Sequence, residues 1–219
     1  MEGAEEGAVW DGGGHRYQLE KVVGNGAFGI VWRARSEDGD VVAIKKVLLD
    51  RRYHNRELQM MKVMEHESIV RLRHYFEKVG RKKDETYLHL VMDYLPETLR
   101  SVALQHHKRR KRFPVDHIKA YLWQTFRALR YMHEVGVAHR DLKPTNILLN
   151  RDCELALADF GLARHLPSRE PAAGDAPFSP SAHSRHLTRY VVTRWYRAPE
   201  LLVQNRSYDT AVDLWSVGC

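Results

Sequence analysis

Alternating apolar and polar residues in the first part of the chain predict β-strands, and one stretch with helical spacing interrupts them. The pattern predicts strands over residues 17–23, 29–35, 41–47, 70–76 and 87–92, and a helix over residues 55–65. The pair Asp38-Gly39, just before the third strand, is typical of a hairpin turn. Residues 1–14 hold few large apolar side chains and are predicted to form a flexible acidic tail.

Beyond Asp93 the apolar residues recur at intervals of three and four, which predicts helices. One long amphipathic helix with a single buried face is predicted from Ile118, Tyr121, Leu122, Thr125, Phe126, Leu129 and Met132. Residues 167–184, of which 13 are Pro, Ala, Ser or Gly, have the composition of a mobile loop. An apolar helix begins at residue 210 and has no later residues to pack against, so we expect the chain to be a fragment of something longer.

Composition and charge narrow the class of protein. The chain has 219 residues, of which 43% are hydrophobic and 29% charged. This amino-acid composition is typical of a globular domain and excludes a wholly disordered or fibrous protein. Its two cysteines exclude a disulfide framework, and the absence of a long apolar run or a presequence predicts a soluble intracellular protein with no membrane partner. The net charge is +7, and since residues 1–14 carry −4, the remainder carries +11, which favours anionic partners.

A glycine-rich segment, Gly24-Asn25-Gly26-Ala27-Phe28-Gly29, is the first motif with chemical meaning. Glycines let the backbone approach an anion closely, both in dinucleotide-binding proteins and in kinases. A dinucleotide site requires a helix after the glycines, whereas residues 30–35 alternate as a strand. The segment is therefore interpreted as a hairpin that covers phosphates, and an ordinary glycine-rich hairpin is the simpler alternative.

Lys45 lies in an apolar strand 21 residues after Gly24 and shares a strand face with Ala43, whereas Lys46 points to the other face and is expected to be solvated. In the predicted helix, Glu57 falls on the apolar face, where a carboxylate is costly unless it is paired. We expect a Lys45–Glu57 ion pair that orients a nucleotide phosphate. A purely structural ion pair is the alternative.

The most specific motif is HRDLKPTN at residues 139–146, followed by DFG at residues 159–161. Asn146 and Asp159 supply the oxygen ligands that Mg²⁺ prefers alongside substrate phosphates. Asp141 can accept the proton of an attacking hydroxyl, and Lys143 can neutralise a transferring phosphate. A polar surface turn is the alternative.

Together with the glycine segment, VAIK at residues 42–45 and APE at residues 198–200, these motifs resemble a eukaryotic protein kinase over residues 17–219. The resemblance implies an α+β, bilobal fold, with a small antiparallel β-sheet N-lobe carrying one helix and a mainly helical, incomplete C-lobe. The implied limits are residues 15–92 for the N-lobe, 93–95 for the hinge and 96–219 for the C-lobe.

Lys143 is similar to the lysine of serine/threonine kinases, and RWYRAPE at residues 194–200 resembles the CMGC group. Within that group, NRELQ at 55–59 and DYLPET at 93–98 resemble glycogen synthase kinases. DFGLAR at 159–164 and TRYVVTRW at 188–195 resemble mitogen-activated protein kinases, which implies phosphorylation at Thr188 and Tyr190 by an upstream activating kinase. Arg189 departs from the Glu, Asp or Gly that usually separates these two residues.

The same resemblance implies a nucleotide between the lobes, with ATP and Mg²⁺ as cofactors. Residues around adenine would be Val23, Val31, Ala43 and Leu148, with Met92 behind the base and the backbone of Asp93 and Leu95 at its edge. Asp213 would hold the catalytic-loop backbone. Arg56, Arg140 and Arg164 would converge on one phosphate, either that of Thr188 or a priming phosphate on the substrate.

The expected function is transfer of the ATP γ-phosphoryl group to Ser/Thr of proteins at proline-directed or phosphate-primed sites, by a monomeric enzyme. The basic run KRRKR at residues 108–112 is read as a solvated helix end, with a nuclear-import or nucleic-acid patch as the alternative. We therefore expect a cytoplasmic enzyme that enters the nucleus if this run acts as an import signal, and we do not expect nucleic acid as a partner. A catalytically weak or inactive binding module is the main alternative function, because the C-terminal helices of such a fold are not in the sequence.

Overall fold

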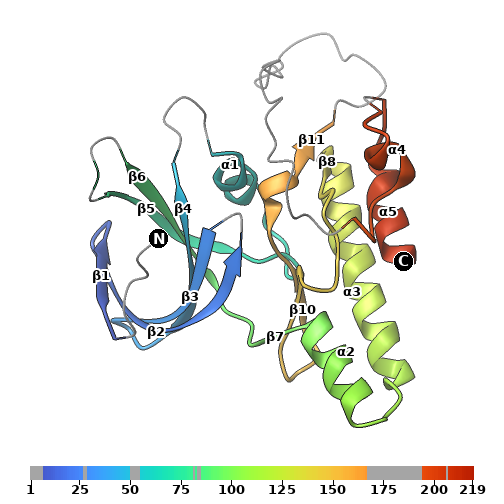
Figure 1. Ribbon diagram of the computed structural model, residues 1–219, viewed down its shortest axis with the longest axis horizontal. Helices are drawn as coiled ribbons and strands as arrows, with labels where there is room; N and C mark the ends of the chain where they lie inside the picture. Colours follow the sequence, from blue (N-terminus) through green and yellow to red (C-terminus); the bar gives the residue numbers. More distant parts are fainter. Residues whose placement is uncertain are drawn as a thin grey trace.

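The N-terminal part of the chain forms one antiparallel sheet with a helix packed against it (Figure 1). The computed structural model describes residues 7–26, 29–49, 55–80, 82, 85–166, 194–205 and 207–219. The six strands have the order β1-β2-β3-β4-β6-β5. Their bounds are Val9–Gly12 (β1), His15–Gly26 (β2), Gly29–Ser36 (β3), Val41–Leu48 (β4), Leu72–Val79 (β5) and Thr86–Asp93 (β6), and the helix α1 spans Arg56–Val63.

Local sequence explains where these elements begin and turn. Gly39 has φ +89° in the turn between β3 and β4, a conformation that favours glycine, as the Asp38-Gly39 pair predicts. Helix α1 begins after Asn55, whose side-chain oxygen accepts a hydrogen bond of 2.9 Å from the backbone N–H of Leu58. Such an N-cap satisfies one of the free N–H groups in the first turn.

The flexible tail expected over residues 1–14 is wrong for residues 9–12, which form β1 and pair with β2. The physical reason is Trp10, which is 9% exposed because its ring packs edge-on against Trp32 and His89 at centroid distances of 6.2 and 4.8 Å. Burial of one tryptophan offsets the entropic cost of ordering a short strand.

The rest of the chain is mainly helical, with short strands that face the N-lobe (Figure 1). Its helices are α2 (Leu99–Lys108), α3 (Val115–Glu134), α4 (Pro199–Leu202) and α5 (Ala211–Gly218), with a short 3₁₀ helix η1 (Phe160–Leu162). Strands β7 (Glu97–Thr98), β9 (Ile147–Leu149) and β10 (Leu155–Leu157) form one small sheet, and β8 (Val137–Ala138) pairs with β11 (Arg164–His165). This arrangement confirms the predicted α+β fold with two lobes.

Helix α3 confirms the predicted long amphipathic helix but corrects its buried face. Tyr121, Thr125, Leu129 and Met132 are buried as expected, together with Ala128. In contrast, Ile118, Leu122 and Phe126 are between 41% and 48% exposed, so these three form no part of the core in this structure. Periodicity defines an apolar side of a helix, but the width of the covered stripe depends on neighbouring elements.

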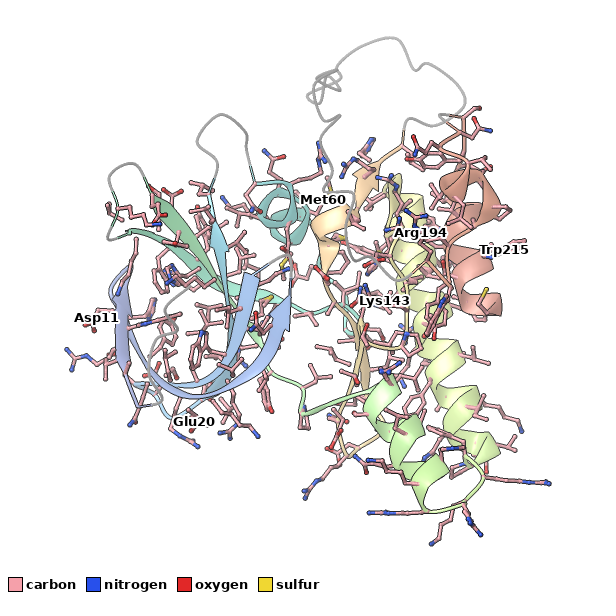
Figure 2. The ribbon with its side chains drawn as sticks, viewed as in Figure 1. Asp11, Glu20, Met60, Lys143, Arg194 and Trp215 are labelled. Carbon is pink, nitrogen blue, oxygen red and sulfur yellow. The ribbon has the colours of Figure 1, made fainter. Side chains whose placement is uncertain are left out.

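The largest hydrophobic core joins the two lobes. It contains methionines of α1, including Met60 and Met61, together with Leu129 of α3 and Phe160 of η1. An isolated bridge between Ile69 and Leu157 ties the segment before β5 to β10. On the far side of the C-lobe, Trp215 is 52% exposed and points outward from α5 (Figure 2). Among the described residues, no helix is long and apolar enough to span a membrane.

Candidate active site

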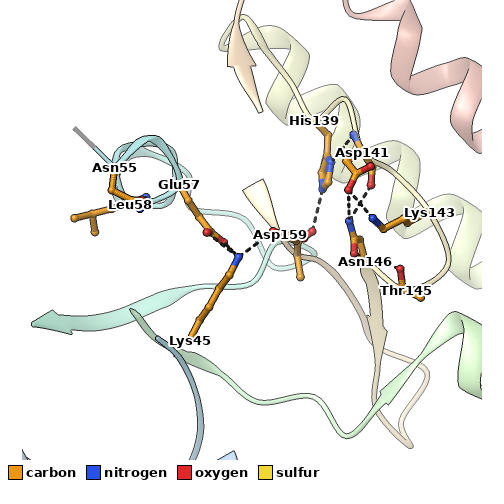
Figure 3. Close-up of polar contacts among 11 residues, drawn as sticks. Lys45, Asn55, Glu57, Leu58, His139, Asp141, Lys143, Thr145, Asn146 and Asp159 are labelled. Atoms are coloured by element: carbon orange, nitrogen blue, oxygen red, sulfur yellow. Dashed lines mark hydrogen bonds and ion pairs between the residues drawn. The ribbon is translucent and has the colours of Figure 1, made fainter. Parts of the chain in front are cut away.

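Three charged side chains from three elements meet between the lobes (Figure 3). The Lys45 ammonium on β4 donates to both carboxylate oxygens of Glu57 on α1, at 2.8 and 2.7 Å, and to Asp159 Oδ1 before η1, at 3.0 Å. The side chains of Lys45 and Glu57 are 7% and 6% exposed. We call Lys45, Glu57 and Asp159 the buried triad.

Burial and pairing compete within the buried triad. Burial alone would lower the pKa of Lys45, but the carboxylates of Glu57 and Asp159 outweigh that effect and raise it. Burial likewise works to raise the pKa of Asp159, yet the Lys45 ammonium lowers it. Burial raises the pKa of Glu57, and the Lys45 ammonium opposes that rise. Because both carboxylate oxygens of Glu57 accept hydrogen bonds from this ammonium, we assign the two side chains as an ion pair. Lys45 is therefore a fixed cation, as predicted.

The other lysine of this strand is less solvated than expected. Lys46 lies on the opposite face of β4, with its ammonium 4.3 Å from the centroid of the Tyr87 ring and 5.8 Å from that of Trp10. Lys46 thus packs against the rings of Tyr87 and Trp10. Of the two lysines, Lys45 is the one that belongs to the buried triad.

A buried carboxylate of α5 holds the loop that follows β8. Asp213, which is 0% exposed, accepts hydrogen bonds from the backbone N–H groups of His139 at 2.9 Å and Arg140 at 2.8 Å. Its Oδ2 also lies 2.9 Å from Nε2 of His133 on α3. Arg140 has φ +67°, and the two carboxylate contacts hold this strained backbone in place.

Asp141 projects from this fixed loop and is surrounded by donors (Figure 3). Its Oδ2 accepts from Lys143 Nζ at 2.7 Å and from Asn146 Nδ2 at 3.2 Å. Asn146 Nδ2 also donates to the Asp141 carbonyl at 2.9 Å, and Arg197 lies 3.8 Å from the other carboxylate oxygen. The carboxylate has a defined orientation and remains able to accept one more proton donor.

Asn146 and Asp159 offer oxygen atoms in the same region. The amide nitrogen of Asn146 is occupied by Asp141, which directs its Oδ1 away from that contact. Asp159 Oδ1 faces Lys45 and leaves the second carboxylate oxygen as a ligand. No group of three or more His, Cys, Asp or Glu among the described residues could hold a metal ion alone. Two oxygen ligands from the protein suit Mg²⁺, because this ion usually takes the rest of its coordination shell from substrate phosphates and water.

The glycine segment ends β2 and begins β3. Gly24 pairs with Val31 across the hairpin. At Gly29, φ is +117° and an added Cβ would lie 2.2 Å from the carbonyl oxygen of Lys46, so only glycine fits. Ala27 and Phe28 lie outside the described residues, whereas Asn25 and Gly26 occupy the exposed end of β2.

Most of the predicted adenine-site residues belong to the core that joins the two lobes or pack against it. Ala43 on β4 and Met92 on β6 are each 9% exposed and adjacent in register. Val31 of β3, Leu95 after β6 and Leu148 of β9 pack against the same core. Val23, which is 43% exposed, is not part of this core.

Comparison with protein families agrees with this geometry: the model described as protein kinase domain matches residues 17–219. The chain belongs to the protein kinase family. In members of this family the domain generally binds ATP and Mg²⁺, and the buried triad and the Asp141 loop lie within the matched residues.

Three arginines of this kinase gather beside the Asp141 loop. Burial and the charges of Arg56 and Arg140 lower the pKa of Arg164 to about 10. Burial and Arg140 likewise lower the pKa of Arg56. Arg140 acts on both other arginines and Arg56 acts on Arg164, so these like charges lie near enough to influence one another. That they bind one phosphate stays a prediction. We call Arg56, Arg140 and Arg164 the arginine cluster.

Sequence reasoning missed Tyr208, whose ring lies 5.3 Å from the Arg140 guanidinium. Burial lowers the pKa of Arg140, and the charge and hydrogen bond of Tyr208 partly offset that effect. Sequence reasoning also assigned no role to Arg197, although RWYRAPE contains that residue, or to His133. Spacing gives no signal for Tyr208, because it reaches Arg140 only through tertiary packing. The predicted phosphorylation sites Thr188 and Tyr190 lie outside the described residues.

Proposed function

We propose that this kinase transfers the γ-phosphoryl group of ATP to serine and threonine hydroxyls of proteins. The single observation that supports this most is the buried triad, in which Lys45 is fixed by Glu57 and Asp159 at 2.7–3.0 Å. A lysine held in this way is a preorganised cation, which suits the α and β phosphates and requires no rearrangement when they bind.

The residues of the Asp141 loop and Asp159 have the remaining roles: accepting the proton, neutralising charge and binding the metal ion. Asp141 orients the acceptor hydroxyl and takes its proton, because its carboxylate is anchored and ionisable. Lys143, bound to Asp141 at 2.7 Å, neutralises charge that develops on the transferred group. Asn146 and Asp159 would hold Mg²⁺, which would supply further charge neutralisation.

The preference for serine and threonine and the CMGC assignment rest on Lys143 and on residues 194–200. Within that assignment, the arginine cluster is a site for one phosphate. Two sources fit it: phosphorylated Thr188 in the same chain, or a phosphate already present on the substrate. We favour Thr188, because the Thr-x-Tyr spacing is intact and the segment from Asp159 to Glu200 is long enough to need an ordering contact.

The experiment measures transfer from radiolabelled ATP with Mg²⁺ to matched Ser-, Thr- and Tyr-containing peptides. We expect phosphate on Ser and Thr, and a loss of at least about 10²-fold in Asp141→Asn, the range for a missing general base. Transfer restricted to tyrosine would refute the proposed specificity, and full turnover in Asp141→Asn would refute the proposed mechanism.

A further inference from the structure

The last residue of β6, where the sheet passes into the hinge, is tied to the neighbouring strand through its side chain. Asp93, at the end of β6, accepts from Arg73 Nε of β5 at 2.5 Å, and the same guanidinium donates to Asp40 at 2.7 Å. Arg71 lies 3.8 Å from the second Asp93 oxygen, and the Asp93 N–H donates to the Arg71 carbonyl at 3.2 Å. Arg73 therefore joins the hinge to the turn between β3 and β4.

The next residue is held from the other side. The guanidinium of Arg33 on β3 lies 5.5 Å from the centroid of the Tyr94 ring. Arg33 also forms an ion pair with Glu20 of β2, and Glu20 accepts from Arg35 Nε at 3.1 Å. Arg73 thus holds Asp93 and Arg33 holds Tyr94, and we call these two contacts the hinge clamp.

The position of the hinge clamp distinguishes it from scattered surface ion pairs. Arg73 and Asp93 are only 31% and 32% exposed, and both line a cavity of about 650 Å³ behind the hinge, on the side of Trp123 and Cys153. Hydrogen bonds to Asp93 and Asp40 outweigh burial and raise the pKa of Arg73. Because one planar guanidinium contacts two carboxylates, its geometry is fixed in a way that a lysine would not reproduce.

We propose that Arg73 and Arg33 are positioning residues that hold the backbone of residues 93–95 in the orientation needed to bind the edge of adenine. This inference rests on the proposed function only for the identity of the nucleotide. The hinge contributes backbone hydrogen bonds, whose strength falls steeply with misalignment. Adenine is remote from the reacting atoms, so the clamp strengthens binding equally in the ground state and the transition state.

The test compares wild type with Arg73→Met, Arg73→Lys and Arg33→Met in the full chain. Arg73→Met should raise KM for ATP by about 3- to 10-fold and leave kcat within about 2-fold, because only uniform binding is lost. Arg73→Lys should have an intermediate effect, since one ammonium replaces a two-carboxylate contact. Arg33→Met should have a smaller effect in the same direction.

Adenosine, which lacks phosphates, is the second probe. Its Kd should rise in Arg73→Met by about the same factor as KM for ATP, which separates the hinge from phosphate electrostatics. The matched control is Arg16→Met, which removes a 3.0 Å ion pair with Asp11 at the far edge of the same sheet, where the partners are 69% and 68% exposed. This control should leave both constants unchanged.

Hydrogen exchange of the amides of residues 93–95 in ligand-free protein tests the clamp without any activity. We expect faster exchange in Arg73→Met than in wild type and in Arg16→Met. If exchange and adenosine affinity are the same in all three, the clamp is refuted whatever the enzyme does. If the wild type transfers no phosphate while exchange and adenosine affinity still change as expected, the proposed function fails and the clamp stands.

Discussion

Neighbouring residues of α1 enter two charged groups of opposite character. Glu57 belongs to the buried triad, where one ammonium serves two carboxylates within 3.0 Å. Arg56 belongs to the arginine cluster, where Arg140 lowers the pKa of Arg56 and both of them lower that of Arg164. The triad surrounds its one cation with two carboxylates of the same chain, whereas the cluster has an excess of positive charge. The cation of the triad has its counter-ions in the folded chain, whereas the cluster favours an anion that comes from elsewhere.

The largest expected effect comes from breaking the triad at its centre. Lys45→Met should reduce kcat/KM at least about 10²-fold, because it removes the cation aimed at the phosphates. Lys46→Met, on the same strand but the opposite face, is the control and should stay within about 3-fold of wild type. Steady-state phosphorylation of a Ser/Thr peptide measures both, and normal turnover in Lys45→Met would contradict the assigned role.

Measurements of unfolding free energy should separate the contribution of the triad to stability from its contribution to activity. Lys45→Met leaves the Glu57 carboxylate buried without its partner, which costs about 3–5 kcal/mol of unfolding free energy. Lys45→Met/Glu57→Leu should recover most of that loss without recovering activity, because apolar side chains replace the pair. Urea denaturation followed by circular dichroism measures this. If the double variant is no more stable than the single one, the cost does not come from the unpaired carboxylate.

The arginine cluster is tested through the source of its anion. Arg56→Ala and Thr188→Ala are compared on primed and unprimed versions of one peptide. If phosphorylated Thr188 fills the cluster, each change should lower activity on both peptides by about 10-fold, in line with loss of a charge-assisted contact. If Thr188→Ala keeps full activity while Arg56→Ala loses only the preference for the primed peptide, the anion comes from the substrate. If neither change alters any activity, the cluster binds no phosphate.

The smallest expected effect has the opposite sign from the triad. Arg164→Met should raise the unfolding free energy by on the order of 1 kcal/mol, or about 2–4 °C in Tm, because it removes a partly buried cation repelled by its neighbours. The pKa of Arg164 in the folded protein is about 10, below its ordinary value. The charged arginine therefore destabilises the folded state fully below about pH 10, and this destabilisation declines as the pH rises above that value. The increase in unfolding free energy caused by Arg164→Met should therefore be constant between about pH 6 and 9.

Thermal melts with and without inorganic phosphate complete this comparison. Phosphate should raise the Tm of wild type more than that of Arg164→Met, since a ligand of the folded state stabilises it by mass action. A variant that melts below wild type at every pH in that range would show that the three arginines do not repel one another.

Much of the site could be predicted because its residues lie in short motifs with a fixed local geometry. Alternation along β4 places Lys45 beside Ala43, and helical spacing places Glu57 beside Met60 and Met61. Prediction failed where a partner is distant in sequence. Strand β1 depends on Trp10 meeting His89, and Tyr208 meets Arg140 across 68 residues of chain.

Local repeats in the sequence predict which faces of β4 and α1 hold the candidate catalytic side chains, because side chains alternate along a strand and recur every 3.6 residues along a helix. Which charges lie close to one another depends instead on how distant segments pack in the folded chain. This packing brought Asp159 to Lys45, Asp213 to the backbone of His139, and Arg164 to Arg56. Coulomb interactions depend on distance and burial, and neither quantity is contained in a local pattern.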